Sequence, residues 1–157
     1  LITMKVRRGA YVTEVSEKDL RDVYHLLSLL ESDAAAVVAK TASPADLKKL
    51  QSLHSELEAA GKPGKEKHNK FFEVNEAFHM CLLALSQNKW RDQMVADLRK
   101  VMKLNRHNSL FKTGRITESL QEHQAIMAAL LAKDPLATSA RMREHFANGL
   151  TAASTSP

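Results

Sequence analysis

The chain has 157 residues, a net charge of +5 and one cysteine, Cys81. This length suits a single domain with a buried core. One cysteine excludes an internal disulfide and fits a reducing cytoplasm, and no apolar run is long enough to cross a membrane. The charges are dispersed along the chain, so they do not by themselves indicate nucleic-acid binding. With only 5 Gly and 4 Pro, the composition favours an all-α protein.

The first 15 residues differ from the rest because they are basic and rich in residues that favour strands. We interpret residues 1–15 as the end of a preceding domain together with a linker. Residues 154–157 are predicted to be a disordered tail. The domain itself is therefore predicted to span residues 16–153.

Six amphipathic segments follow one another within residues 16–153. Their predicted boundaries carry N-cap, proline or glycine signals, in chain order Ser16, Ser43-Pro44, Gly61, Asn88, Thr113-Gly114 and Asp134-Pro135. The first helix should run to about residue 40, the third to about 86 and the fifth to near 134. Polar Asn105 and Ser109 fall on the apolar stripe of the fourth segment. Short connections between six helices predict an antiparallel six-helix bundle.

Three histidines and one asparagine lie on the inner stripes of these helices. Asn75 and His79 are four residues apart and project side by side, whereas His123 and His145 belong to two other helices. A single histidine of this kind is usually a hydrogen-bonded core residue, but a metal ion would satisfy all three imidazoles at once. Neutral imidazole suits zinc, with nickel or manganese as alternatives. The sequence therefore makes the four residues a candidate metal site.

Catalytic signals are absent from the sequence: it has no nucleophile motif, no glycine-rich phosphate loop and no zinc-protease motif. Glu122 and Glu144 each precede a histidine, and neighbouring helical positions diverge by about 100°. We therefore expect both glutamates to point away from the histidines, leaving no general base for a metal-bound water. A non-enzymatic role is favoured. Two alternatives remain open: a metal-dependent helical-bundle hydrolase, and a metal-free structural dimerisation module.

Four segments, residues 75–79 (NEAFH), 84–88 (ALSQN), 118–126 (ESLQEHQAI) and 134–146 (DPLATSARMREHF), carry a recognisable pattern. They resemble motifs of the FCD ligand-binding domain of GntR-superfamily transcriptional regulators, and the resemblance covers about residues 12–152. Residues 8–12 are similar to the strand that closes the wing of that family's winged helix-turn-helix domain. Gly9 keeps one of the two glycines of that strand, and Arg7 stands in place of the other. Six helices resemble the shorter, VanR-like type.

The resemblance implies that Asn75, His79, His123 and His145 bind a divalent metal ion. Many relatives have aspartate at the first of these positions, so Asn75 should weaken or retune the site. Relatives often carry an arginine in the first helix near a bound carboxylate, and here that position is Leu27.

Without this arginine, an acidic effector needs a positive charge from elsewhere, or the effector is of another kind. Arg106 is the best substitute, and Asn105 and Ser109 are further candidates for the pocket wall.

Together these features predict the effector-binding and dimerisation domain of a cytoplasmic GntR-type regulator. It is expected to form a homodimer, to bind an organic acid at the metal, and so to control operator DNA binding by an upstream domain.

Overall fold

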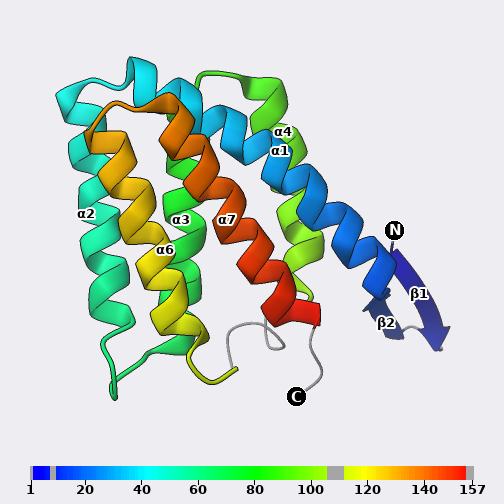
Figure 1. The fold of residues 1–157 in the computed structure, drawn as a ribbon. Coiled ribbons are helices and arrows are strands. Elements are labelled where there is room, and N and C mark those ends of the chain that lie inside the picture. The colour runs from blue at the N-terminus through cyan, green and yellow to red at the C-terminus, as the bar shows by residue number, and fades with distance from the viewer. Residues whose placement is uncertain (1, 8–9, 106–111, 155–157) are drawn as a thin grey trace.

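The computed structural model describes residues 2–7, 10–105 and 112–154 (Figure 1). The chain begins with an antiparallel hairpin of two strands, β1 (Ile2–Arg7) and β2 (Ala10–Val15). This hairpin accounts for the predicted strand segment in front of the bundle. Arg8 and Gly9, which belong to the predicted wing motif, lie outside the described residues.

Six helices lie within the described part of the chain, which confirms the predicted all-α fold. They are α1 (Glu17–Thr41), α2 (Pro44–Ala60), α3 (His68–Leu85), α4 (Lys89–Lys103), α6 (Arg115–Leu131) and α7 (Pro135–Ser154). Helix α7 includes Ser154, the first residue of the segment predicted as a tail.

The predicted N-caps explain where three of the helices begin. Ser16 Oγ accepts a hydrogen bond from the backbone N–H of Asp19 at 3.0 Å, and Asn88 Oδ1 accepts one from Arg91 N–H at 3.1 Å. Ser43 and Asp46 form a reciprocal capping box in front of Pro44. Each cap satisfies backbone N–H groups that lack a partner in the first helical turn.

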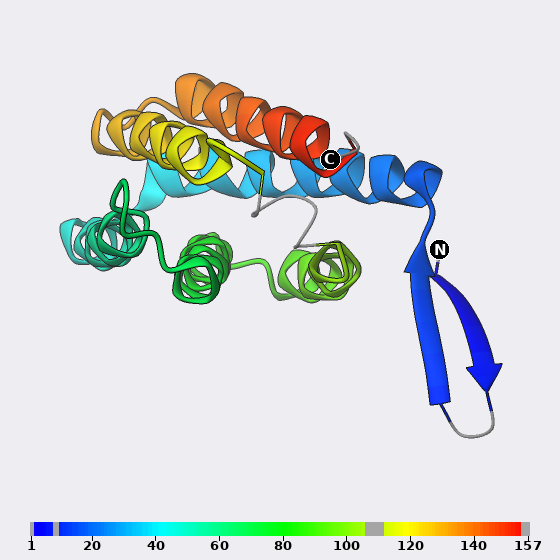
Figure 2. The ribbon, with the colours of Figure 1, turned by 90° about the horizontal axis from the view of Figure 1, so that it is seen from below.

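The helices form layers on either side of α1. Figure 2 shows α2, α3 and α4 side by side in one row, with α6 and α7 lying together on the opposite side of the molecule. Helix α1 packs most extensively against α7 and also contacts α3 and α4. The hairpin projects from the first turn of α1, away from the other helices (Figure 2).

Buried apolar side chains from all six helices fill the space between the layers. Leu27 is fully buried in this core, so the α1 position where relatives often have arginine serves packing here. None of the described helices combines the length and the apolar character needed to cross a lipid bilayer.

Candidate functional site

Three histidines from three different helices meet in the interior of the bundle. His79 comes from α3, His123 from α6 and His145 from α7, and all three are at most 7% exposed. One ring nitrogen of each lies within 4.8 Å of a ring nitrogen of the others. The ring centroids of His79 and His145 are 5.3 Å apart, and those of His123 and His145 are 4.7 Å apart. Helix packing thus brings together the three histidines that the sequence singled out.

Two buried carboxylates fix the orientation of two of these rings. His79 Nδ1 lies 2.7 Å from Glu31 Oε1, and His145 Nδ1 lies 2.5 Å from Glu122 Oε1. When Nδ1 donates its hydrogen to a carboxylate, Nε2 carries the lone pair that can bind a metal. The site therefore has the carboxylate–histidine arrangement that commonly orients metal ligands.

The expectation that Glu122 points away from the histidines was wrong. Glu122 does diverge from His123 on its own helix, but the divergence turns its carboxylate toward α7, where it meets His145 and the Nδ2 of Asn148. Glu144 agrees with the expectation: it is exposed and pairs with Arg141. The angle between adjacent residues predicts divergence within one helix, but it does not say which neighbouring helix receives the side chain.

Several buried nitrogen and oxygen atoms among the described residues at this site have no hydrogen-bond partner and are suited to bind a metal ion. Within the described residues, His79 Nε2, both ring nitrogens of His123 and Asn75 Oδ1 are buried without a hydrogen-bond partner. Such atoms are rare in folded proteins because each loses its hydration without compensation. One divalent ion would satisfy His79 Nε2, one ring nitrogen of His123 and Asn75 Oδ1, while the other His123 nitrogen keeps its hydrogen, and this chemistry suits zinc.

Burial also keeps the imidazoles in the form that binds metal. Burial, reinforced by the neighbouring His145 and His79, lowers the pKa of His123 well below its ordinary value. Burial lowers the pKa of His145 to about 4, although the bond to Glu122 acts in the opposite direction. Both rings are therefore neutral at physiological pH and can bind a metal without first losing a proton.

Two buried arginines hold the carboxylates in place. Arg99 of α4 lies between Glu31, at 2.7 Å, and Glu76. Arg115 of α6 binds both oxygens of Glu122, at 2.9 and 3.0 Å. Burial alone would raise the pKa of Glu31, but the charge of Arg99 and the contact with His79 outweigh it and lower that pKa to about 2. Burial also acts to raise the pKa of Glu122, but its hydrogen bonds with His145 and Arg115 outweigh burial and lower that pKa.

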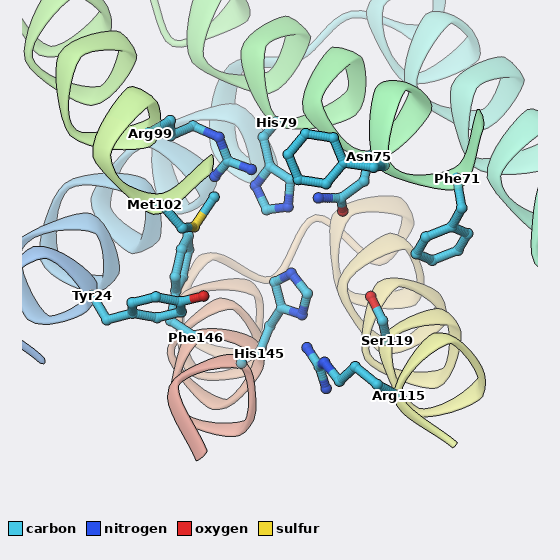
Figure 3. Close-up of a pocket in the computed structure, with 12 residues that line it drawn as sticks. Tyr24, Phe71, Asn75, His79, Arg99, Met102, Arg115, Ser119, His145 and Phe146 are labelled. Atoms are coloured by element: carbon cyan, nitrogen blue, oxygen red, sulfur yellow. The ribbon is translucent and has the colours of Figure 1, made fainter. Parts of the chain in front are cut away.

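A cavity of about 60 Å³ adjoins the histidines, and side chains from α1, α3, α4, α6 and α7 surround it (Figure 3). Asn75, His79 and His145 line it, together with both arginines. The other lining residues are Tyr24, Phe71, Phe72, Met102, Ser119, Phe146 and Gly149. The imidazole of His123 packs beside the other two rings without lining the cavity.

Of the three pocket residues predicted on or beside the stripe of the fourth helix, the structure describes Asn105. Helix α4 ends at Lys103, and Asn105 follows it with its Nδ2 donating to the carbonyl of Ala153 at 3.2 Å. Arg106 and Ser109 lie outside the described residues. The arginines that line the cavity are Arg99 and Arg115.

Sequence reasoning missed these two arginines, although a signal was present. Arg99 lies four residues after the buried Val95 on the inner stripe of α4, and Arg115 and Glu122 lie two turns apart on one face of α6. A charged residue at a position reserved for apolar side chains indicates a buried ion pair. Glu31, fully buried on α1, is a further example of such a residue.

Comparisons with known proteins identify the family and the fold of this chain. Residues 22–148 match the family described as the FCD domain, whereas a comparison with curated protein sequences gave no match. The fold resembles that of E. coli McbR/YncC, with a TM-score of 0.84 and 22% identity over 96% of this chain and 72% of that one.

Two further solved structures share the fold. Streptococcus agalactiae GntR gives a TM-score of 0.72 at 23% identity, over 94% of this chain and 74% of that one. The metal-free FCD domain of the transcriptional regulator TM0439 gives 0.71 at 17% identity, over 90% of this chain and 95% of that one. Since the family match spans most of the chain, the chain belongs to the FCD domain family.

Proposed function

We propose that this chain is the effector-sensing and dimerisation domain of a GntR-type transcriptional regulator. In this proposal Asn75, His79, His123 and His145 hold a divalent metal ion, most suitably zinc. A small organic acid binds beside it in the cavity, and binding alters operator recognition by an attached DNA-binding domain. The observation that carries the proposal is the convergence of the three buried histidines, together with the unpartnered buried atoms on Asn75, His79 and His123.

Residues around the site would orient the metal ligands and hold the orienting carboxylates in place. Glu31 and Glu122 orient His79 and His145, while Arg99 and Arg115 keep those carboxylates ionised and immobile. A bound divalent ion supplies positive charge and open coordination positions for carboxylate oxygens.

The arrangement gives less support to the hydrolase alternative. A hydrolytic site needs a carboxylate or imidazole free to accept a proton from water. Here Glu31 and Glu122 each bind a histidine and an arginine already. The two carboxylates nearest the histidines are thus occupied in positioning them.

A thermal-shift screen of small organic acids against this chain, with and without a chelator, tests the proposal. Stripped protein reloaded with zinc should retain about one ion per chain, and one or more acids should raise its melting temperature. Chelator should abolish that effect, and His123→Ala should neither retain zinc nor respond to acids. Protein that retains almost no zinc, with a melting temperature that added zinc does not change, would contradict the proposal and favour the metal-free dimerisation module. Stabilisation by acids that persists in chelator would contradict the role of the metal.

A further inference from the structure

The four candidate metal ligands bring no negative charge to the site. Three are imidazole rings, from His79, His123 and His145, and the fourth is the side-chain amide of Asn75. Within the described part of the chain, Asn75 Oδ1 is buried without a hydrogen-bond partner. Figure 3 shows this amide beside the ring of His79, with both directed toward His145. A divalent ion held by these four groups would therefore keep both of its positive charges.

The two carboxylates nearest the histidines already have partners. Glu31 and Glu122 contact the Nδ1 atoms of two histidines, which leaves Nε2 as the atom that can bind the ion. Each carboxylate also binds a buried guanidinium, Arg99 at 2.7 Å and Arg115 at 2.9 Å. The arginines thus compensate these negative charges, and the carboxylates reach the ion only through a neutral ring.

Glu76 follows Asn75 in the sequence, but its carboxylate is directed to α4. Its Oε2 accepts a hydrogen bond from Nε of Arg99 at 2.6 Å, and its Oε1 lies 4.0 Å from Nζ of Lys103. The described residues that line the cavity include two arginines and no acidic residue. Negative charge in direct contact with the ion must therefore come from solution.

Uncompensated charge at a largely buried site is unfavourable. An anion that binds the ion from the cavity supplies the compensation that the ligands lack. Because coupling between two binding events is reciprocal, the anion then raises the affinity for the metal by the same factor as the metal raises the affinity for the anion. Aspartate has nearly the same shape as asparagine, so a carboxylate at position 75 would supply that compensation permanently and weaken the coupling.

We propose that the uncharged side chain of Asn75 makes occupancy of the metal site depend on an anion, so that metal and anion bind as a pair. The inference rests on the proposed function, because it takes the metal site as given. It adds a form of regulation and assigns that regulation to one residue of the ligand set.

Competition with a fluorescent zinc chelator tests the inference when zinc affinity is measured with acetate, with acetamide and with neither. Perchlorate keeps the ionic strength constant. We expect acetate to raise the zinc affinity of the wild-type chain by about tenfold, since couplings of this kind usually amount to roughly 5–150-fold. Acetamide has the size of acetate without its charge and should leave zinc affinity unchanged.

Asn75→Asp should change the two affinities in opposite directions. Zinc affinity without acetate should rise by about tenfold, and the effect of acetate should fall to less than about threefold. Asn69→Asp makes the same chemical change at an exposed position of the same helix that does not line the cavity. This control should keep both the zinc affinity and the acetate effect of the wild-type chain.

Asn75→Ala provides a second test, because a buried carboxylate without its ion can destabilise the aspartate variant. The alanine variant removes the amide oxygen and adds no charge. Its zinc affinity should not exceed that of the wild-type chain, and its acetate effect should keep about the wild-type size. Circular dichroism checks that each variant is folded. Loss of the acetate effect in folded Asn75→Ala would contradict the inference.

The outcomes distinguish the inference from the proposed function. An acetate effect of equal size in Asn75→Asp and wild type, or a wild-type zinc affinity that acetate does not change, overturns the inference and leaves the metal site in place. If the wild-type chain retains no zinc under any of the three conditions, the proposed function fails and the inference fails with it.

Discussion

At the scale of single residues, the site depends on side chains that are not themselves candidate ligands. Glu31 and Glu122 each bind the Nδ1 of a histidine and a guanidinium. A histidine held in this way loses little rotational freedom when its Nε2 binds a metal, and the carboxylate makes the ring more basic. Substitution of a residue that is hydrogen-bonded to a candidate ligand should therefore change the metal affinity of the site.

Glu122→Gln should lower zinc affinity by about 10–100-fold, the usual effect of removing an orienting carboxylate. The charge on the partner of His145 Nδ1 is lost, and Arg115 loses its bidentate partner. Competition with a fluorescent zinc chelator measures the change. Glu144→Gln is the control, because this exposed glutamate contacts Arg141 instead. Equal zinc affinity in Glu122→Gln and the wild-type protein would show that the carboxylate does not position the ring.

The candidate ligands could be found from the sequence, but the carboxylates that orient the histidines could not. Spacing places Asn75 and His79 on one face, and apolar stripes mark His79 and His123 as unusual. The stripe around His145 is less clear, and the family resemblance supports its inclusion. The partner of each histidine comes from elsewhere: Glu31 reaches His79 from α1, and Glu122 reaches His145 from α6. Such pairs depend on how helices are rotated against one another, and helical periodicity within one segment carries no information about that rotation.

At the scale of elements, local signals determined most helix boundaries. Ser16, Ser43 and Asn88 cap helices where predicted because each cap depends on residues within three positions. The end of α4 is different: the backbone N–H groups of Leu104 and Asn105 bond to carbonyls three residues back, a tightened turn that closes the helix at Lys103. The polar residues beyond it continue the spacing of the stripe, so the pattern did not reveal the stop.

Gly61, the C-cap of α2, lets three helices approach one another closely. A Cβ added there would lie 2.7 Å from Leu120 Cδ1 and 3.0 Å from both Ile116 Cγ2 and Phe71 Cε2. Its φ of −101° is open to any residue, so the glycine provides room and not an unusual backbone conformation.

Gly61→Ala should therefore destabilise the fold by about 1–3 kcal/mol, as overpacking of a filled core does. Urea denaturation followed by circular dichroism measures the change. Lys62→Ala, at the exposed neighbouring position, should change stability by less than about 0.5 kcal/mol. A Gly61→Ala protein as stable as the wild type would show that α2 can shift away from α3 and α6 at little cost.

At the scale of the whole molecule, the candidate ligands connect helices that are distant in sequence. Asn75 and His79 belong to α3, His123 to α6 and His145 to α7. An ion bound by all four would link both layers of the bundle, because α3 lies in the row with α2 and α4 while α6 and α7 lie opposite (Figure 2). Its binding free energy would then stabilise the domain as one unit.

Free zinc at 100 times its Kd should add about 2.7 kcal/mol to the free energy of unfolding. For a chain of this size the melting temperature should rise by roughly 5–10 °C. Differential scanning calorimetry with zinc and with chelator measures the shift. His123→Ala should remove it, whereas His25→Ala, at an exposed position on α1, should retain it. An equal shift in both variants would place zinc at some other site.

The unbroken course of α1 has a mechanical consequence. One helix carries Tyr24 in the cavity wall and Glu31 against His79, and its first turn adjoins the hairpin. From Glu31 back to Glu17 it rises by roughly 21 Å, and a continuous helix turns as a rigid rod. A tilt of about 5° centred on Glu31 moves the start of the rod by about 2 Å, by the same helical rise. A small tilt of α1 at the cavity, which the core can accommodate, thus produces a larger displacement where the hairpin is attached.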